Sequence, residues 1–543
     1  MGVVNVKSSS ASSSSSQAQA QQHQKQQQHQ NVDNNYRPKS LGFWLILISA
    51  LVSMFLVALD RTIVATAIPR ITDDFGSLGD VGWYGSAYML TTAAFQLVFG
   101  RLYRFYGLRT IFLCSIVVFM AGSALCASAP NSPVFILGRA VSGLGSAGIM
   151  TGSTMIIIPM VPLPKRPMFQ SLFGILFGIA SVTGPLIGGA FTQHATWRWC
   201  FYMNLPIGAV AFVWLLVFLR LPTLPGKPAT AREHIMRLDP LGTLFFVPSI
   251  VCLVLALQWG GSTYHWSNWR IAVLFVIFAL GITAFCAVQY LLPDTATLPV
   301  RIVKQRTMLS AAFAMFFLSG SMVMCVYYIP LWFQTTHGVD PVKSGIYTIP
   351  LVVSLVIASL MSAAVTQRIG HYAPSMLLSP CVSAIGQGFM TTWTPSTASP
   401  QWIGFQFLVG FGLGLGMQSG NLAVQAALAP ADVSTGISIN FFAQQLGGAV
   451  SLSIGQTILS GLLVQRLAHV LPGLDAQAIV RMGATEMQRI APPGLVGQVV
   501  GAYNYALTRV FFAGLAFAIA QLLSACFVEW RSIKKQRPVE AKA

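Results

Sequence analysis

The chain has 543 residues, of which 54% are hydrophobic and only 8% are charged, whereas a soluble domain usually carries about 25% charged residues. So few charged side chains cannot cover the surface of a soluble protein of this length. The composition therefore excludes that class and indicates a chain that lies in a lipid bilayer. The net charge of +18 does not predict nucleic-acid binding, because the basic residues form short clusters between apolar runs and no single stripe or arm.

Residues 1–40 precede the apolar part of the chain and are low in complexity. Residues 8–30 are almost wholly Ser, Gln, Ala and His, a composition that cannot bury a hydrophobic core. We therefore expect a disordered cytoplasmic tail. It has no apolar stretch of the kind found in signal peptides, so we expect the first transmembrane helix to direct membrane insertion.

The rest of the chain contains about fourteen apolar runs, each close to the roughly 20 residues that an α-helix needs to cross the bilayer core. Gly and Pro within these runs do not argue against helices, because neighbouring helices satisfy the freed backbone groups. The sequence thus predicts an all-α, polytopic membrane protein. The predicted transmembrane helices are residues 42–64, 84–102, 110–129, 134–157, 168–191, 200–220, 240–258, 271–292, 309–333, 345–366, 374–393, 402–424, 436–463 and 505–528.

The basic residues predict the orientation of these helices. When both termini are placed in the cytoplasm, most of the 32 Lys and Arg residues fall in inner segments, as the positive-inside rule requires. This agreement favours an even number of spans. Residues 464–504 then form a long outer loop, which we expect to hold one or two short amphipathic helices, and residues 531–543 form a cytoplasmic tail.

The sequence contains no pattern typical of an enzyme or of a metal site. The eight cysteines lie in or beside predicted helices without any C-x-x-C pair, so we expect free thiols in apolar surroundings. The eight histidines have no metal-ligand spacing, and there is no Gly-rich phosphate-binding loop of the Walker type. We therefore expect no catalytic residue, no metal, no cofactor and no ATP binding.

Few ionisable residues lie within the predicted helices, where they are costly and usually functional. Asp60 is the clearest carboxylate inside a span, and burial disfavours the charged form of a carboxylic acid, which suits a group that loads and releases a proton. Arg61 points about 100° away on a helix and need not pair with it. Arg139 is a cation within a span that needs a partner or a water-filled cavity. The alternatives are structural: Asp60 pairs near the outer interface, and Arg139 holds a backbone carbonyl.

Two further motifs contain glycines at short intervals. The first lies in the fifth span, where small residues and a proline let another helix approach and bend the backbone. It comprises Gly184, Pro185, Gly188 and Gly189. The second is the loop after the second span, whose basic residues the positive-inside rule alone would also explain. It comprises Gly100, Arg101, Arg104, Gly107 and Arg109.

In their order and spacing, these motifs resemble those of the fourteen-span drug:proton antiporters of the major facilitator superfamily, and in particular fungal efflux pumps. The resemblance covers about residues 40–530 and is carried by residues 59–69, 138–145, 180–189, 197–208, 327–334 and 441–448. It implies two six-helix halves and a linker with two extra transmembrane helices. The implied boundaries are residues 41–221, 222–306 for the linker, and 307–530.

The resemblance also implies roles for the motifs. Asp60 and Arg139 would relay protons, the fifth-span motif would limit leak between the halves, and the loop around residues 100–109 would act in gating. In the family an acidic residue in that loop is thought to latch the two halves. Arg104 stands where this acid is usual, which puts a latch of that form in doubt.

The family fold places the substrate near the middle of the membrane, between the two halves. Aromatic and amide side chains would stack on amphipathic molecules and hydrogen-bond to them there, although ordinary packing is the alternative for each residue. The candidates are Tyr88, Gln96, Tyr327, Tyr328, Trp332, Gln334, Gln418, Asn421, Asn440, Phe441, Gln444 and Gln445.

The expected function is proton-coupled efflux of amphipathic small molecules, such as toxins, secondary metabolites or drugs, by a monomer in the lipid bilayer. Its partners are a small organic substrate and protons, with no nucleic acid. The alternatives are a transporter of siderophores or vacuolar basic amino acids on the same fold, and a non-transporting sensor. We expect the plasma membrane as its location, with the vacuolar membrane as the alternative.

Overall fold

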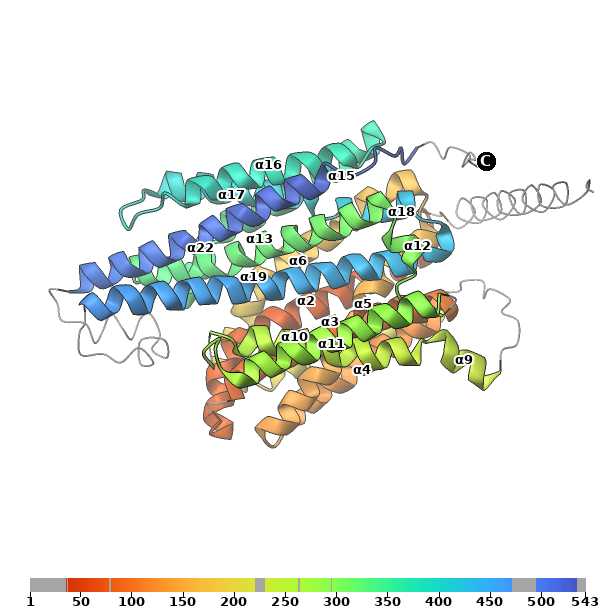
Figure 1. Cartoon of the computed structure of the whole chain (residues 1–543), viewed down its shortest axis with the longest axis horizontal. Helices are drawn as coiled ribbons and strands as arrows, with labels where there is room; N and C mark the ends of the chain where they lie inside the picture. The colour runs from red at the N-terminus through yellow and green to blue at the C-terminus, as the bar shows by residue number, and fades with distance from the viewer. Residues whose placement is uncertain are drawn as a thin grey trace, which may run out of the picture.

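A computed structural model describes residues 36, 38–77, 80–219, 230–261, 264–293, 295–470 and 495–534. Within these ranges the chain forms α-helices and short 3-10 turns, and β-type pairing is limited to two isolated bridges. Most of the predicted N-terminal tail, and residues 535–543 of the predicted C-terminal tail, lie outside the described residues. The long helices run side by side, roughly along the longest axis of the molecule (Figure 1).

The predicted first half forms a group of helices that begins at Leu41. Its first helix is longer than predicted and places Asp60 near its middle, well before the left-handed Gly76 that follows its last residue. The side chain of Asn131 caps α5 by accepting a hydrogen bond from the backbone of Val134. The helices are α2 (Leu41–Phe75), α3 (Val81–Phe105), α4 (Leu108–Ser128), α5 (Ser132–Met160), α6 (Arg166–His194), α7 (Trp199–Tyr202) and α8 (Asn204–Phe218), with the 3-10 turn η2 (Leu163–Lys165) before α6.

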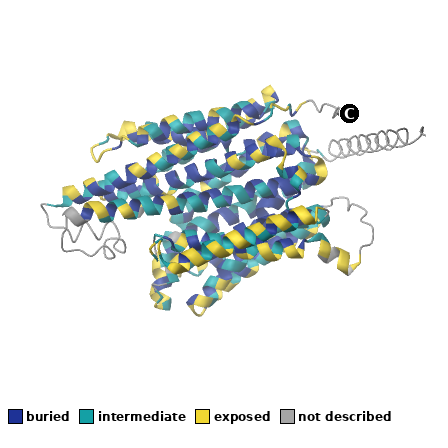
Figure 2. Cartoon of the chain, in the orientation of Figure 1, coloured by how far each residue is buried: buried dark blue, intermediate teal, exposed yellow. Residues whose placement is uncertain are grey.

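The predicted linker contributes a pair of long helices flanked by two short ones. They are α9 (Ala231–Arg237), α10 (Pro240–Trp259), α11 (Trp269–Leu291) and α12 (Val300–Val303). Phe246 and Ile250 of α10 pack in one apolar cluster with Leu97 of α3 and Phe442 of α19. The pair therefore lies over the line where α3 meets α19, with many exposed residues on its other side (Figure 2).

The predicted second half contains the remaining helices. They are α13 (Arg306–His337), α14 (Pro341–Tyr347), α15 (Ile349–Ile369), α16 (Ala373–Met390), α17 (Ser399–Gly416), α18 (Ser419–Ala427), α19 (Val433–Val470) and α22 (Val496–Ala525), with the 3-10 turn η3 (Pro430–Asp432) before α19. Because α19 continues to Val470 and α22 begins at Val496, the segment between them is shorter than the predicted loop of residues 464–504. Residues 471–494 of that loop, and the amphipathic helices predicted there, lie outside the described residues.

Of the helices that the structure describes, 12 are long and apolar enough to cross a membrane, so the predicted count of fourteen is not reached. The two predicted spans without such a helix, residues 84–102 and 374–393, fall on α3 and α16. Both segments are helical, but polar side chains lower their hydropathy. Two arginines lie near the end of α3, and α16 buries three serines and Gln387.

The hydrophobic core joins the two groups of helices at one end of the molecule and divides at the other. At the joined end, one cluster contains Phe112 and Met160 of the first group together with Met308, Val433 and other residues of the second. Towards the opposite end, the cluster around Phe135 contains residues of the first group alone. The large cluster there in the second group, which includes Trp332 and Trp393, takes in only the partly buried Phe177 from the first.

Candidate functional site

A buried ion pair lies inside the first group of helices. The Nη1 atom of Arg139 on α5 is 2.5 Å from Oδ2 of Asp60 on α2, and both side chains are at most 1% exposed. The Nε atom of Arg139 donates to the carbonyl of Tyr84 at 2.8 Å, and its guanidinium lies 4.6 Å from the ring centre of Tyr88. The structure therefore brings together the two residues that the sequence predicts as proton-coupling groups. The two opposite charges compensate each other, which lowers the cost of burying either of them.

Asn204, at the start of α8, completes the surroundings of Asp60. Its Nδ2 atom lies 3.3 Å from Oδ1 of Asp60 and 3.2 Å from the hydroxyl of Ser123 on α4. Asn204 is 1% exposed and its Oδ1 atom has no hydrogen-bond partner among the described residues. The sequence analysis did not single out Asn204. The available signal was an amide at the start of an apolar span that otherwise contains few polar residues.

The fifth-span motif packs directly against α2, just beyond Asp60. A Cβ atom added at Gly184 would lie 2.1 Å from Oγ1 of Thr62, and one at Gly188 would lie 2.2 Å from Oγ1 of Thr66. The hydroxyl of Thr62 also donates to the carbonyl of Ala180 on α6 at 3.0 Å. These two glycines are required for the close approach of α6 to α2. Gly189 has nothing within 4 Å of such an atom, and Pro185 lies inside the helix, half-buried.

The predicted gating loop contributes contacts to three different parts of the chain. A Cβ atom at Gly100 would lie 2.4 Å from the hydroxyl of Ser438 on α19, so the glycine allows the two groups of helices to touch here. Arg101 donates to the carbonyls of Arg237 and Thr295 in the linker. Arg109 donates to the carbonyl of Leu216 on α8, and Gly107 precedes α4 without a close contact.

Arg104 forms an ion pair that crosses between the two groups of helices. Its Nη2 atom lies 3.4 Å from Oδ1 of Asp432, which is 4% exposed and immediately precedes α19. Arg301 of α12 donates to both oxygens of the same carboxylate, at 2.6 and 2.8 Å. These hydrogen bonds raise the pKa of the Arg301 guanidinium. The carboxylate absent from the loop is therefore supplied by the opposite group of helices, with the basic partner on the loop.

Several predicted cavity residues are packed within one group of helices in this structure. Tyr88 and Tyr328 are 1% exposed, and each hydroxyl faces a backbone carbonyl, of Val57 and Leu452 respectively. Gln96 is buried and donates to Thr151 on α5 at 2.6 Å. Trp332 is fully buried: its Nε1 donates to Asn504 at 2.8 Å, and its ring lies 4.5 Å from that of Trp393. Gln334 donates to Ser344 at 2.9 Å.

The remaining predicted cavity residues lie on α13, α18 and α19 or beside them. Asn440 donates to Asn421 at 3.3 Å, and both side chains are buried. Phe441 joins the cluster that both groups of helices share, whereas Tyr327 is 60% exposed and Gln444 is half-buried.

Gln445 makes a contact between the two groups of helices near the ion pair. Its Oε1 atom accepts a hydrogen bond from Nη1 of Arg61 on α2 at 3.3 Å. As expected from the helical rotation, Arg61 turns away from Asp60 and towards α19. The sequence analysis assigns Arg61 no role of its own. The signal that was available is its position next to Asp60.

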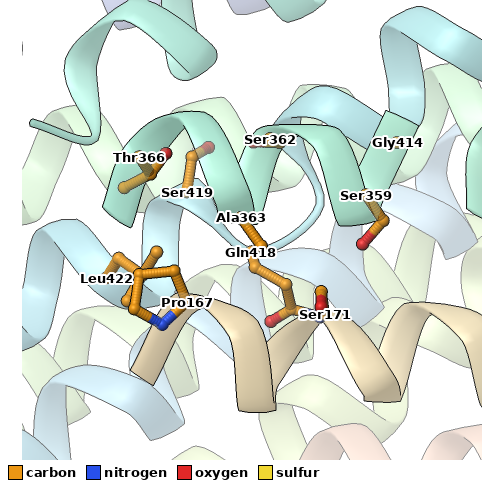
Figure 3. A pocket seen from close by; sticks show the side chains of 10 residues that line it. All are labelled: Pro167, Ser171, Ser359, Ser362, Ala363, Thr366, Gly414, Gln418, Ser419 and Leu422. Carbon is orange, nitrogen blue, oxygen red and sulfur yellow. The ribbon is translucent and has the colours of Figure 1, made fainter. Parts of the chain in front are cut away.

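A small, polar pocket lies between the two groups of helices, close to the end where their cores join (Figure 3). One side comes from Pro167 and Ser171 of α6, and the other side comes from α15, α17 and α18 and the turn between the last two. Gln418, a predicted cavity residue, lines it. The other lining residues are Ser359, Ser362, Ala363, Thr366, Gly414, Ser419 and Leu422. In the part of the chain that the structure describes, no three His, Cys, Asp or Glu side chains gather as a metal site would require.

A family model described as Major Facilitator Superfamily matches residues 50–452. This match covers more than half of the chain, and the chain belongs to this superfamily. It is thus a multi-pass membrane transport protein, built from helices in the manner of its family.

Curated relatives match almost the whole chain. The chain is 47% identical to the "MFS-type efflux pump MFS1" of Trichophyton rubrum, over 90% of this chain and 92% of the relative. It is 47% identical to the "Efflux pump aflT" of Aspergillus parasiticus, over 91% and 96% of the two chains. It is 43% identical to the "Rubrofusarin-specific efflux pump aurT" of Gibberella zeae, over 93% and 92%.

Solved structures show the same fold at low sequence identity. The human organic anion transporter MFSD10 (TETRAN) aligns with a TM-score of 0.56 at 13% identity, over 88% of this chain and 99% of that one. The proton:xylose symporter XylE aligns with a TM-score of 0.55 at 15% identity, over 83% and 96% of the two chains. The helical architecture is therefore that of a major facilitator transporter.

Proposed function

We propose that this protein exports amphipathic small molecules, such as toxins, secondary metabolites or drugs, by alternating access coupled to proton entry. The observation that carries the coupling is the isolated Asp60–Arg139 pair, buried in a span and held by Asn204. The direction of transport is inferred from the relatives. They are named efflux pumps, and this chain aligns with nearly their whole length.

The pair offers a physical route from protonation to movement. Protonating Asp60 removes the negative charge that Arg139 faces, and a buried, unpaired guanidinium is costly. Tyr84 and Tyr88 supply only a carbonyl and a ring face to it. A rearrangement of α2 against α5 that gives Arg139 new partners is then favoured. Because Gly184 and Gly188 pack on α2, the movement would also reach α6.

The division of the hydrophobic core supports an assignment of the conformational state. The joined end of the molecule contains Arg104, Asp432 and the 3-10 turn that ends at Lys165. Its basic residues favour placing this end on the cytoplasmic side of the membrane. We propose that the structure is closed towards the cytoplasm and separated on the outer side. In this state a substrate would leave and a proton would enter from outside.

We propose fourteen transmembrane helices with both termini in the cytoplasm, in two six-helix halves with α10 and α11 as the extra pair. This requires α3 and α16 to cross the membrane as packed inner helices despite their polar side chains. Single cysteines at Arg368 and Ser396, on either side of α16, test it with a membrane-impermeant thiol reagent on intact cells. We expect mass spectrometry to find only Ser396→Cys labelled. Labelling at both positions would contradict a crossing of α16.

Inside-out membrane vesicles with an acidic lumen test proton-coupled export. We use the fluorescent amphipathic probe 1-pyrenebutanol and expect uptake that a protonophore abolishes and that Asp60→Asn removes. Asp73→Asn is the matched control, because Asp73 is an exposed carboxylate on the same helix. Uptake that ignores both the protonophore and Asp60→Asn would refute the proposed coupling.

We place the protein in the plasma membrane as a monomer, with the vacuolar membrane as the alternative. The alternative substrates are siderophores and basic amino acids, and a cationic amino acid would favour acidic groups facing the substrate path. Among the described residues, the buried acids are Asp60, Asp239 and Asp432, and all three accept hydrogen bonds from other side chains. This observation favours the export of amphipathic molecules over the transport of basic amino acids.

A further inference from the structure

Arg61 lies near the middle of α2, and no carboxylate among the described residues forms an ion pair with its guanidinium. Among the described residues the ion pairs within 4.0 Å involve Arg104, Arg139, Arg301 and Arg531, and Arg61 is not among them. Asp60, its neighbour in sequence, is already neutralised by Arg139. The three charges Asp60, Arg139 and Arg61 therefore sum to one net positive charge within the membrane.

The second group of helices contributes another donor at the same place. Gln445 is 7% exposed; its Oε1 accepts from Arg61, while its buried Nε2 has no hydrogen-bond partner among the described residues. An unpaired donor in a buried position is costly unless some other group completes it. Arg61 is half-buried, unlike the fully buried Asp60, and it bridges the two groups of helices.

The chemistry that complements this arrangement is an anionic or strongly hydrogen-bond-accepting group. A planar guanidinium and an amide N–H both donate, and a carboxylate or phenolate oxygen accepts from both. A cation would be repelled by the net positive charge, and a neutral apolar molecule would leave both donors unsatisfied.

We propose that Arg61 and Gln445 form a binding site for the acidic group of an amphipathic substrate, so that the transported molecules are organic anions. This inference rests on the proposed function, since it assigns the substrate class of the same path. Because the bond from Arg61 to Gln445 joins the two halves, an anion bound there would replace or supplement an inter-half contact. The site would then report substrate occupancy to both halves.

Equilibrium binding to the purified full chain in lipid nanodiscs tests the site directly at pH 7.5. The probes are 1-pyrenebutyrate, which is ionised at this pH, and 1-pyrenebutanol, which has the same apolar body without the charge. We expect tighter binding of the butyrate, measured by fluorescence anisotropy. Arg61→Gln should weaken butyrate binding by about ten-fold or more, as for loss of a charged hydrogen bond, and change butanol binding by less than about two-fold.

Two variants separate the site from general effects. Arg61→Lys keeps the charge and should retain most of the preference for butyrate. Arg70→Gln removes the same charge from an exposed position on the same helix and should change neither probe. Gln445→Leu should weaken butyrate binding less than Arg61→Gln, because it removes a neutral donor.

The result that overturns the proposal is equal affinity for the two probes, or binding of neither, or an equal effect of Arg61→Gln and Arg70→Gln on butyrate. Failure of the proposed function is a different result. In that case butyrate binds in an Arg61-dependent manner, while inside-out vesicles with an acidic lumen accumulate neither probe. Conversely, protonophore-sensitive uptake of both probes with no dependence on Arg61 leaves export standing and removes the anion site.

Discussion

The interiors of the two halves of this transporter differ in the kind of polar group that they bury. The N-terminal half places an ion pair at its centre, between Asp60 and Arg139. In the C-terminal half the buried polar side chains that the structure describes are neutral amides and hydroxyls, apart from Asp432 at the edge of α19. A neutral hydrogen bond holds one geometry, whereas an ion pair changes its energy when a proton binds. On the proposed function, we therefore expect the N-terminal half to respond to protons directly and the C-terminal half to have no proton-dependent group at its centre.

The largest expected effect comes from removing one partner of the ion pair. Arg139→Leu leaves the carboxylate of Asp60 buried without its cation, so we expect a loss of about 3–5 kcal/mol in the free energy of unfolding. Chemical denaturation of the purified protein in detergent measures it. The double variant Asp60→Asn, Arg139→Gln carries no charge at these two positions and should regain most of the stability while remaining inactive in transport. Equal stability of Arg139→Leu and the double variant would contradict the view that the ion pair distinguishes the interior of the N-terminal half.

Overpacking the contact between α2 and α6 should have the next largest effect. We expect Gly188→Val to cost about 1–3 kcal/mol of stability, because its side chain enters space filled by Ile63 and Thr66. Gly189→Val is the matched control, since the neighbouring position is open. Gly410→Val, which meets the carbonyl of Leu351 in the C-terminal half, should destabilise as much. Only Gly188→Val should also increase proton leak into liposomes, and an equal leak from both would argue against a special role for α6.

A change in the neutral network of the C-terminal half should affect stability but not proton coupling. Asn504 accepts from Trp332 at 2.8 Å and donates to the carbonyl of Trp393 at 3.0 Å. Asn504→Leu leaves both groups unpaired and should cost about 1–3 kcal/mol. The dependence of the uptake rate on pH should keep its midpoint. A shifted midpoint would show that the C-terminal half also responds to protons.

The smallest effect is expected at the ion pairs that join the halves. Arg104 is 24% exposed, so Arg104→Gln should change the free energy of unfolding by only about 0.2–1 kcal/mol, and less at high salt. Asp432→Asn removes the partner of both Arg104 and Arg301 and should have the larger effect. Unfolding at low and high salt measures both. An effect of Asp432→Asn no greater than that of Arg104→Gln would show that Arg301 contributes nothing.

Much of the fold could be predicted from the sequence, because the bilayer restricts a spanning chain to a few solutions. Apolar runs predicted the positions of the long helices, including both helices of the linker. The limits were less accurate: α2 and α19 extend well beyond their predicted ends. The helices α3 and α16 are not apolar enough to count among the twelve, because they contain polar side chains. Hydropathy alone does not distinguish a helix packed inside a membrane protein from a helix of a soluble protein.

For the site, the sequence by itself determined which charged residues need a partner. Asp60 and Arg139 lie in apolar runs, where an unpaired charge is too costly. Only the tertiary structure decided their partners. It joined Asp60 to Asn204, 144 residues away, and Arg61 to Gln445, 384 residues away. It also supplied Asp432 to Arg104, and packed Trp332, a predicted cavity residue, in the core of the second group of helices. The cost of burying a charged side chain can be inferred from the apolar sequence around it. Its partner, however, depends on how helices that are distant in the sequence pack together.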